Sequence, residues 1–146
     1  MESPYLLFLG DANLVGMDKM GAGIRQWRGE LCLGQFRLPG CTADLGLPEM
    51  MPAEAYAQGA RTMIVGVVNV GGVIPDNWMA SIIAAIEAGL DVASGMHQRL
   101  ADIPAIADAA ARHGRTIHDV RAPTRRFLAG TGVKRSGQRL LSLGTG

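Results

Sequence analysis

A histidine and an arginine stand close together in the segment Ser94-Gly95-Met96-His97-Gln98-Arg99. An imidazole with an ordinary pKa of ~6.5 can act as a general base near neutral pH. A guanidinium group binds carboxylates through paired hydrogen bonds. We therefore take His97 as a candidate catalytic base, and Ser94 and Arg99 as candidate substrate-binding residues. The alternative is a capping histidine beside a surface arginine.

A second segment, His118-Asp119-Val120-Arg121, places a cation two residues after an acid. Side chains alternate along a strand, so Asp119 and Arg121 share one face of an extended segment. Asp119 is a second candidate base and Arg121 a candidate substrate-binding residue; alternatively, the two side chains pair with each other. The spacing leaves a triad of Ser94, His97 and Asp119 open. The GxSxG motif of a hydrolase nucleophile is absent.

Paired glycines in Asn69-Val70-Gly71-Gly72 form a third candidate element. Successive backbone N–H groups in such a turn can bind an anion, although paired glycines also serve plain tight turns. We take Asn69, Gly71 and Gly72 as candidate substrate-binding residues.

The first turn of the chain, residues 10–16, does not match the dinucleotide-binding motif GxGxxG. The second glycine of that motif lets the backbone approach a pyrophosphate, and Ala12 stands in its place. A standard NAD site is therefore not predicted. Asp11 remains a candidate for binding a substrate hydroxyl or amine, with a turn-stabilising aspartate as the alternative.

Strand and helix patterns alternate along the chain. Short apolar runs predict strands at 5–9, 31–36, 62–68, 91–93 and 116–120. Between them, helical patterns occur near 24–27, over 53–58, after Asp76 and after Asp102, with these two aspartates as N-caps and Gly114 ending the last helix.

This alternation predicts an α/β fold: a Rossmann-like, doubly wound, mostly parallel sheet of about five strands with helices on both faces. Ligands of such sheets lie beyond the carboxyl ends of the strands. Arg37, which follows the second predicted strand, therefore joins the candidate substrate-binding residues.

The C-terminal quarter of the chain is basic. Residues 112–146 hold eight Lys and Arg and one acid, although the net charge is only +1. This asymmetry predicts contact with an anion, with a solvated basic face as the alternative. Lys134 and Arg135 are the candidate phosphate- or anion-binding pair. We expect residues 1–138 to form one domain, and residues 139–146 to begin a strand that leads into a further domain.

Composition narrows the class of protein. Two cysteines nine positions apart make no CxxC pair, so no metal site is predicted. The apolar run near the N-terminus is too short for a signal peptide or a membrane span, which predicts a cytoplasmic protein without a membrane partner. Phe127 is the one aromatic residue of the basic tail, which argues against a nucleic acid as partner.

Four stretches taken together resemble the D-glutamate N-acetyltransferase family, long catalogued as a domain of unknown function. They are residues 34–41, 94–100, 119–121 and 140–145. The resemblance implies an N-terminal Rossmann-like domain whose C-terminal P-loop partner domain is missing. It also implies acetyl transfer from acetyl-CoA to the amine of the small-molecule substrate D-glutamate, in D-amino-acid catabolism.

For such a reaction, placement at strand ends suggests a role for each candidate. His97 or Asp119 would be the base, the Gly71 and Gly72 amides would hold the oxyanion, and Arg37, Arg99 and Arg121 would bind the two carboxylates. Without its second domain the chain is expected to be inactive alone, and to form a homo-oligomer through an exposed apolar face. The alternative is a nucleotide- or coenzyme-binding or interaction module without catalysis of its own.

Overall fold

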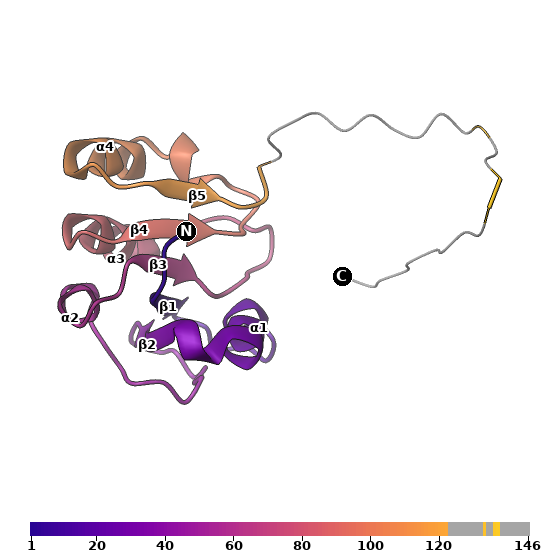
Figure 1. Ribbon diagram of the computed structural model, residues 1–146, viewed down its shortest axis with the longest axis horizontal. Coiled ribbons are helices and arrows are strands. Elements are labelled where there is room, and N and C mark those ends of the chain that lie inside the picture. Colours follow the sequence, from indigo (N-terminus) through magenta and orange to yellow (C-terminus); the bar gives the residue numbers. More distant parts are fainter. Residues whose placement is uncertain (123–132, 134–135, 138–146) are drawn as a thin grey trace.

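The computed structural model describes residues 1–122, 133 and 136–137 (Figure 1). Five parallel strands form one sheet in the order β2-β1-β3-β4-β5. This confirms the predicted Rossmann-like α/β fold. The candidate pair Lys134 and Arg135 and the strand predicted at 139–146 lie outside the described residues. The strands are β1 (Tyr5–Gly10), β2 (Cys32–Arg37), β3 (Thr62–Val65), β4 (Asp91–Ser94) and β5 (Ile117–Asp119).

Helices cover both faces of this sheet. Alternate strand residues such as Leu6, Phe8 and Met63 belong to the larger core cluster, which also contains buried residues of the second, third and fourth helices. Leu7 and Ile64 belong to a smaller cluster that packs against the first helix. None of the helices within residues 1–122 is long and apolar enough to cross a membrane. The helices are α1 (Lys19–Arg28), α2 (Pro52–Ala57), α3 (Asp76–Glu87) and α4 (Pro104–His113), with 3-10 turns η1 (Gly29–Leu31) and η2 (Leu100–Asp102).

Two predicted helix starts are wrong by one residue. The N-caps are Pro75 and Ile103, both in extended conformation, and neither Asp76 nor Asp102 is a cap. For α4 the reason is Pro104 at the first helical position, which restricts the preceding residue to extended conformations. The predicted helix end is confirmed, because Gly114 adopts the left-handed conformation with φ 61°.

A close contact between two glycines joins α1 to the end of β3. The Gly21 amide donates to the Gly66 carbonyl at 2.7 Å. A Cβ atom on Gly21 would lie 3.1 Å from that carbonyl oxygen, so a larger residue would push the helix away. The Gly66 carbonyl is bonded to α1 and not to a neighbouring strand, so β3 ends at Val65, earlier than the predicted Val68.

Trp78 anchors the start of α3 beneath the end of β1. The indole is 1% exposed and packs edge-on against Phe8, with ring centroids 5.6 Å apart. Its Nε1 donates to Asp11 Oδ1 at 2.7 Å, and Asn77 Nδ2 donates to Asp11 Oδ2 at 2.9 Å. Hydrogen bonding from Trp78, the largest effect, lowers the pKa of Asp11. Asp11 therefore fastens α3 to β1.

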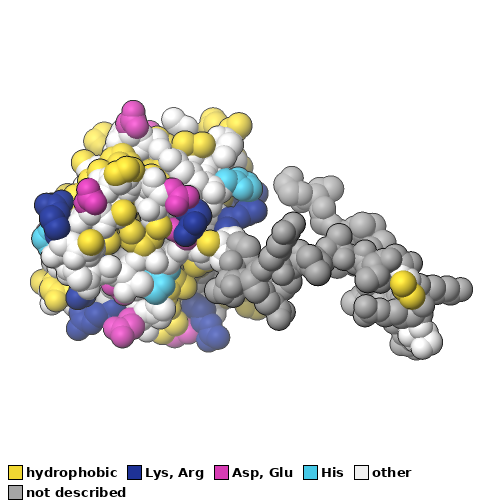
Figure 2. All heavy atoms as spheres, turned by 90° about the horizontal axis from the view of Figure 1, so that it is seen from above, with side chains coloured by type: hydrophobic (Ala, Val, Ile, Leu, Met, Phe, Trp, Pro, Cys, Tyr) yellow, Lys and Arg dark blue, Asp and Glu magenta, His cyan; other side chains and the backbone are white. Residues whose placement is uncertain are grey.

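Charged side chains of both signs are interspersed over the face of the domain drawn in Figure 2, together with small apolar areas. In that view no single charge sign dominates the described residues.

Replacing Asp11 with Asn should lower the free energy of unfolding by about 1.5–3 kcal/mol, because a charge-assisted hydrogen bond to a buried indole is weakened. The folded-state pKa of Asp11 lies below its ordinary value of 3.8. The contribution of the carboxylate is therefore present above that value and is lost as the pH falls through the lower folded-state pKa. Urea titrations of wild type, D11N and the exposed control D108N at pH 7 and below pH 4 test this. Equal stability of D11N and wild type at pH 7 would contradict it.

Candidate functional site

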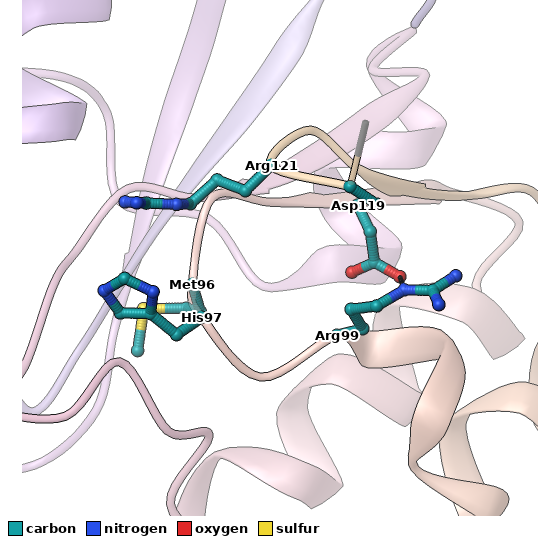
Figure 3. A pocket seen from close by; sticks show the side chains of 6 residues that line it. Met96, His97, Arg99, Asp119 and Arg121 are labelled. Carbon is teal, nitrogen blue, oxygen red and sulfur yellow. Dashed lines mark ion pairs between the residues drawn. The ribbon is translucent and has the colours of Figure 1, made fainter. Parts of the chain in front are cut away.

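A polar cavity of about 440 Å³ opens at the carboxyl ends of β4 and β5 (Figure 3). The loop that follows β4 and the residues that end and follow β5 form its walls. Two parallel strands end side by side here, as the register of Ser94 with Asp119 shows. The cavity is lined by Met96, His97, Arg99, Asp119, Arg121 and Ala122.

His97 and Arg121 extend in the same direction on one side of the cavity, whereas Arg99 lies against Asp119 on the other (Figure 3). His97 and Arg121 are both exposed. Among the described residues Arg121 makes no ion pair, whereas Arg99 is paired with Asp102 at 3.7 Å and Asp119 at 3.8 Å. Arg121 is thus the arginine of this cavity that is available to an anionic ligand.

Asp119 is engaged by the backbone of η2. Its two carboxylate oxygens accept hydrogen bonds from the amides of Leu100 and Ala101 at 2.8 and 3.1 Å. Its side chain is only 9% exposed. This geometry makes Asp119 a cap that ties η2 to β5, and it leaves His97 as the better placed of the two candidate bases.

Ser94 is also occupied within the fold. Its side chain is 2% exposed, and its Oγ accepts a hydrogen bond from the Met96 amide at 3.1 Å. A nucleophilic hydroxyl must reach its substrate, so this placement favours a turn-stabilising role over the open triad.

The loop after β3 is closed by its own side chain. Asn69 receives a hydrogen bond from the Val73 amide at 3.1 Å and donates one to the Val73 carbonyl at 2.7 Å. The Gly72 amide donates to the Asn69 carbonyl at 3.2 Å. Gly71 and Gly72 have φ of 87° and 62°, a region that favours glycine. The turn therefore uses the Gly72 amide internally, and Gly72 lies against His97 instead.

Arg37 lies at the opposite end of the sheet. Its Nε bonds Glu49 at 2.8 Å, and its Nη1 approaches Asp44 at 3.6 Å. Four strand spacings separate β2 from β5, so Arg37 and Arg121 are roughly 19 Å apart across the sheet. Arg37 is held in ion pairs at its own edge of the sheet, and its binding of the same substrate as Arg121 stays a prediction.

The usual ligand position of the fold, where the strand order reverses between β1 and β3, holds a mostly apolar cavity of about 730 Å³ lined by residues 13–17 and 68–70. The amide of Gly21, an orphan donor in the first turn of α1, is bonded to Gly66 rather than free for a phosphate. The Met17 carbonyl accepts a hydrogen bond from the Val68 amide at 2.7 Å. Lys19 begins the helix. The Gly21 amide is therefore not available to a pyrophosphate.

Several residues of the site were not predicted from the sequence. Met96 and Ala122 line the cavity, and Gln98 joins two loops beneath it. Asp119 and Arg121 were expected to share one face of an extended segment, but β5 ends at Asp119 and Arg121 lies in the turn that follows. Both line the cavity, on different sides of it (Figure 3). Trp78 carried no sequence signal for pairing with Asp11, because the two are distant along the chain.

The fold and the site define a Rossmann-like domain with its charged cavity at β4 and β5. The chain belongs to the family described as "Domain of unknown function (DUF1611_N) Rossmann-like domain", whose model matches residues 36–123. A crystal structure of a DUF1611 family protein from Anabaena variabilis has the same fold, with a TM-score of 0.67 at 21% identity over 88% of this chain and 39% of that one.

Two curated relatives carry a name for the activity. The chain is 49% identical to the D-glutamate N-acetyltransferase of Tritonibacter scottomollicae and 39% identical to that of Pseudoalteromonas sp. Each match covers 99% of this chain and 44% of the relative. The chain thus spans less than half the length of these relatives. The matches confirm the family resemblance predicted from the sequence.

The engaged Gly21 amide and Ala12 in place of the second glycine of GxGxxG predict that NADH and NADPH do not bind. Titration with NADH, followed by its fluorescence, should give no saturable change, while a dinucleotide-binding Rossmann enzyme binds under the same conditions. Saturable binding to the wild-type chain that is abolished by a bulkier residue at Gly16, beside the turn after β1, would contradict the prediction.

Proposed function

We propose that this chain forms the amino-acid-binding part of a D-glutamate N-acetyltransferase that uses acetyl-CoA as donor. One observation carries the proposal: an exposed histidine and an arginine without an ion pair line one cavity at the carboxyl ends of β4 and β5. The names of the two curated relatives support the reaction type.

Within this cavity the two side chains take complementary roles. The Arg121 guanidinium binds a substrate carboxylate through paired hydrogen bonds. The substrate amine is protonated near neutral pH and must lose a proton before its nitrogen can attack an acyl carbon. Neutral His97 accepts that proton. Asp119 holds η2 in place and so shapes the wall that carries Arg99.

The described residues fit the amino acid better than they fit the donor. Several cations are needed to bind the phosphates of acetyl-CoA. Within residues 1–122, Arg121 is the one arginine of this cavity that makes no ion pair. We therefore assign donor binding to groups outside this cavity: Lys134 and Arg135 of this chain, and a P-loop partner domain such as the family resemblance implies. Assembly as a homo-oligomer and inactivity of this chain alone belong to the same proposal.

Calorimetric titration with D-glutamate tests the amino-acid site. Wild type should bind, and Arg121→Ala should weaken binding about tenfold or more, because a hydrogen bond to a charged group contributes about 1.5–3 kcal/mol. Arg28→Ala is the matched control, since this arginine on α1 is 71% exposed and far from the cavity. The full-length Tritonibacter scottomollicae relative serves as positive control.

Each result has a defined meaning. Equal affinity of wild type and R121A for D-glutamate would remove Arg121 from the site. Absence of D-glutamate binding together with binding of acetyl-CoA to this chain would favour the alternative, a coenzyme-binding module without catalysis of its own.

A further inference from the structure

We infer that Gly72 and Gln98 are positioning residues that set the orientation of the His97 ring. The catalytic meaning of this inference rests on the proposed function, in which His97 is the base. The structural part stands on contacts between the loop after β3 and the loop after β4.

Gly72 provides the surface on which His97 rests. A Cβ atom on Gly72 would collide with Cδ2 of the imidazole and would lie 2.9 Å from the His97 backbone nitrogen and 3.0 Å from its Cβ. The ring can turn aside, but the backbone nitrogen cannot. The φ of 62° at Gly72 adds a strain that any other residue would meet. Only glycine permits this close approach of the two loops.

Gln98 fastens the same two loops together with two hydrogen bonds. Its backbone amide donates to the Gly72 carbonyl at 2.9 Å. Its side-chain Oε1 accepts from the Ile74 amide at 2.8 Å. Because Gln98 directly follows His97, these bonds fix the backbone from which the imidazole projects.

Packing has to orient this histidine because hydrogen bonding does not. None of the hydrogen bonds within residues 1–122 involves the His97 ring, in contrast to a base that is held by a neighbouring carboxylate. The ring is exposed and would otherwise sample several rotamers. General-base catalysis requires the base within hydrogen-bond reach of the proton it removes. Steric contact with Gly72 restricts the rotamers of His97 in place of a hydrogen bond.

The loop that bears Gly72 is held closed by its own side-chain hydrogen bonds. Asn69 closes it through two hydrogen bonds to Val73, at 2.7 and 3.1 Å. Asn69 and Gly72 were expected to bind substrate; in this interpretation they act through His97 instead.

Nuclear magnetic resonance of the wild-type chain and its variants tests the inference without any substrate. Wild type should show a nuclear Overhauser contact between Hδ2 of His97 and the Hα atoms of Gly72. Gly72→Ala and Gln98→Leu should abolish that contact and shift the ring resonances of His97 by more than their linewidth. Gln98→Glu keeps an acceptor oxygen for the Ile74 amide and should retain the wild-type ring signals.

Gln26→Leu, at an exposed position of α1, is the matched control and should leave His97 unchanged. Thermal unfolding of every variant separates loss of fold from loss of orientation. A fall in melting temperature with unchanged His97 ring signals would overturn the positioning role, as would absence of the contact in wild type. Failure of D-glutamate to bind wild type would remove the proposed function while leaving this result to stand.

Discussion

The arrangement of this domain depends on the close approach of Gly21 to Gly66. The hydrogen bond of 2.7 Å between them caps the first turn of α1 with the end of β3. Only small residues permit this approach, because a Cβ on Gly66 would lie 3.1 Å from the Cα of Gly21. In dinucleotide-binding relatives of the fold, the corresponding helix terminus faces a pyrophosphate. Here the protein's own carbonyl accepts the hydrogen bond of the Gly21 amide at that helix terminus.

The carboxyl ends of β4 and β5 offer a second ligand position in this fold. At β4 and β5 the chain leaves the sheet through a loop that carries His97 and through the residues that follow Asp119. Hydrogen bonds fix the walls there: η2 is capped by Asp119, and the β4 loop is bonded to the β3 loop through Gln98. Among the described residues, the exposed side chains of this cavity without an ion pair are the His97 imidazole and the Arg121 guanidinium. A proton acceptor beside an anion-binding group is the pair that an amino-acid acetyltransferase requires on its acceptor side.

Sequence reasoning predicted the layers of the fold well, because five apolar runs separated by helical patterns leave few arrangements open. It expected Asp119 and Arg121 on one face of an extended segment, but the strand ends at Asp119 and a turn carries Arg121 to the other side of the cavity (Figure 3). It could not show contacts between residues that are distant in sequence. For Asp11 it left a ligand-binding and a structural role open, and the bonds to Trp78 and Asn77 favour the structural role. Arg37 follows a strand as predicted, but strand order, which sequence does not specify, puts it at the far edge of the sheet, where it pairs with Glu49.

We propose that the cavity at β4 and β5, and not the β1–β3 switch point, binds the amino acid. A crystal structure of the chain soaked with D-glutamate should show a carboxylate of the ligand on the Arg121 guanidinium and its amine facing the His97 ring. Ligand density beside residues 13–17 at the end of β1, with the β4–β5 cavity free of ligand, would contradict it.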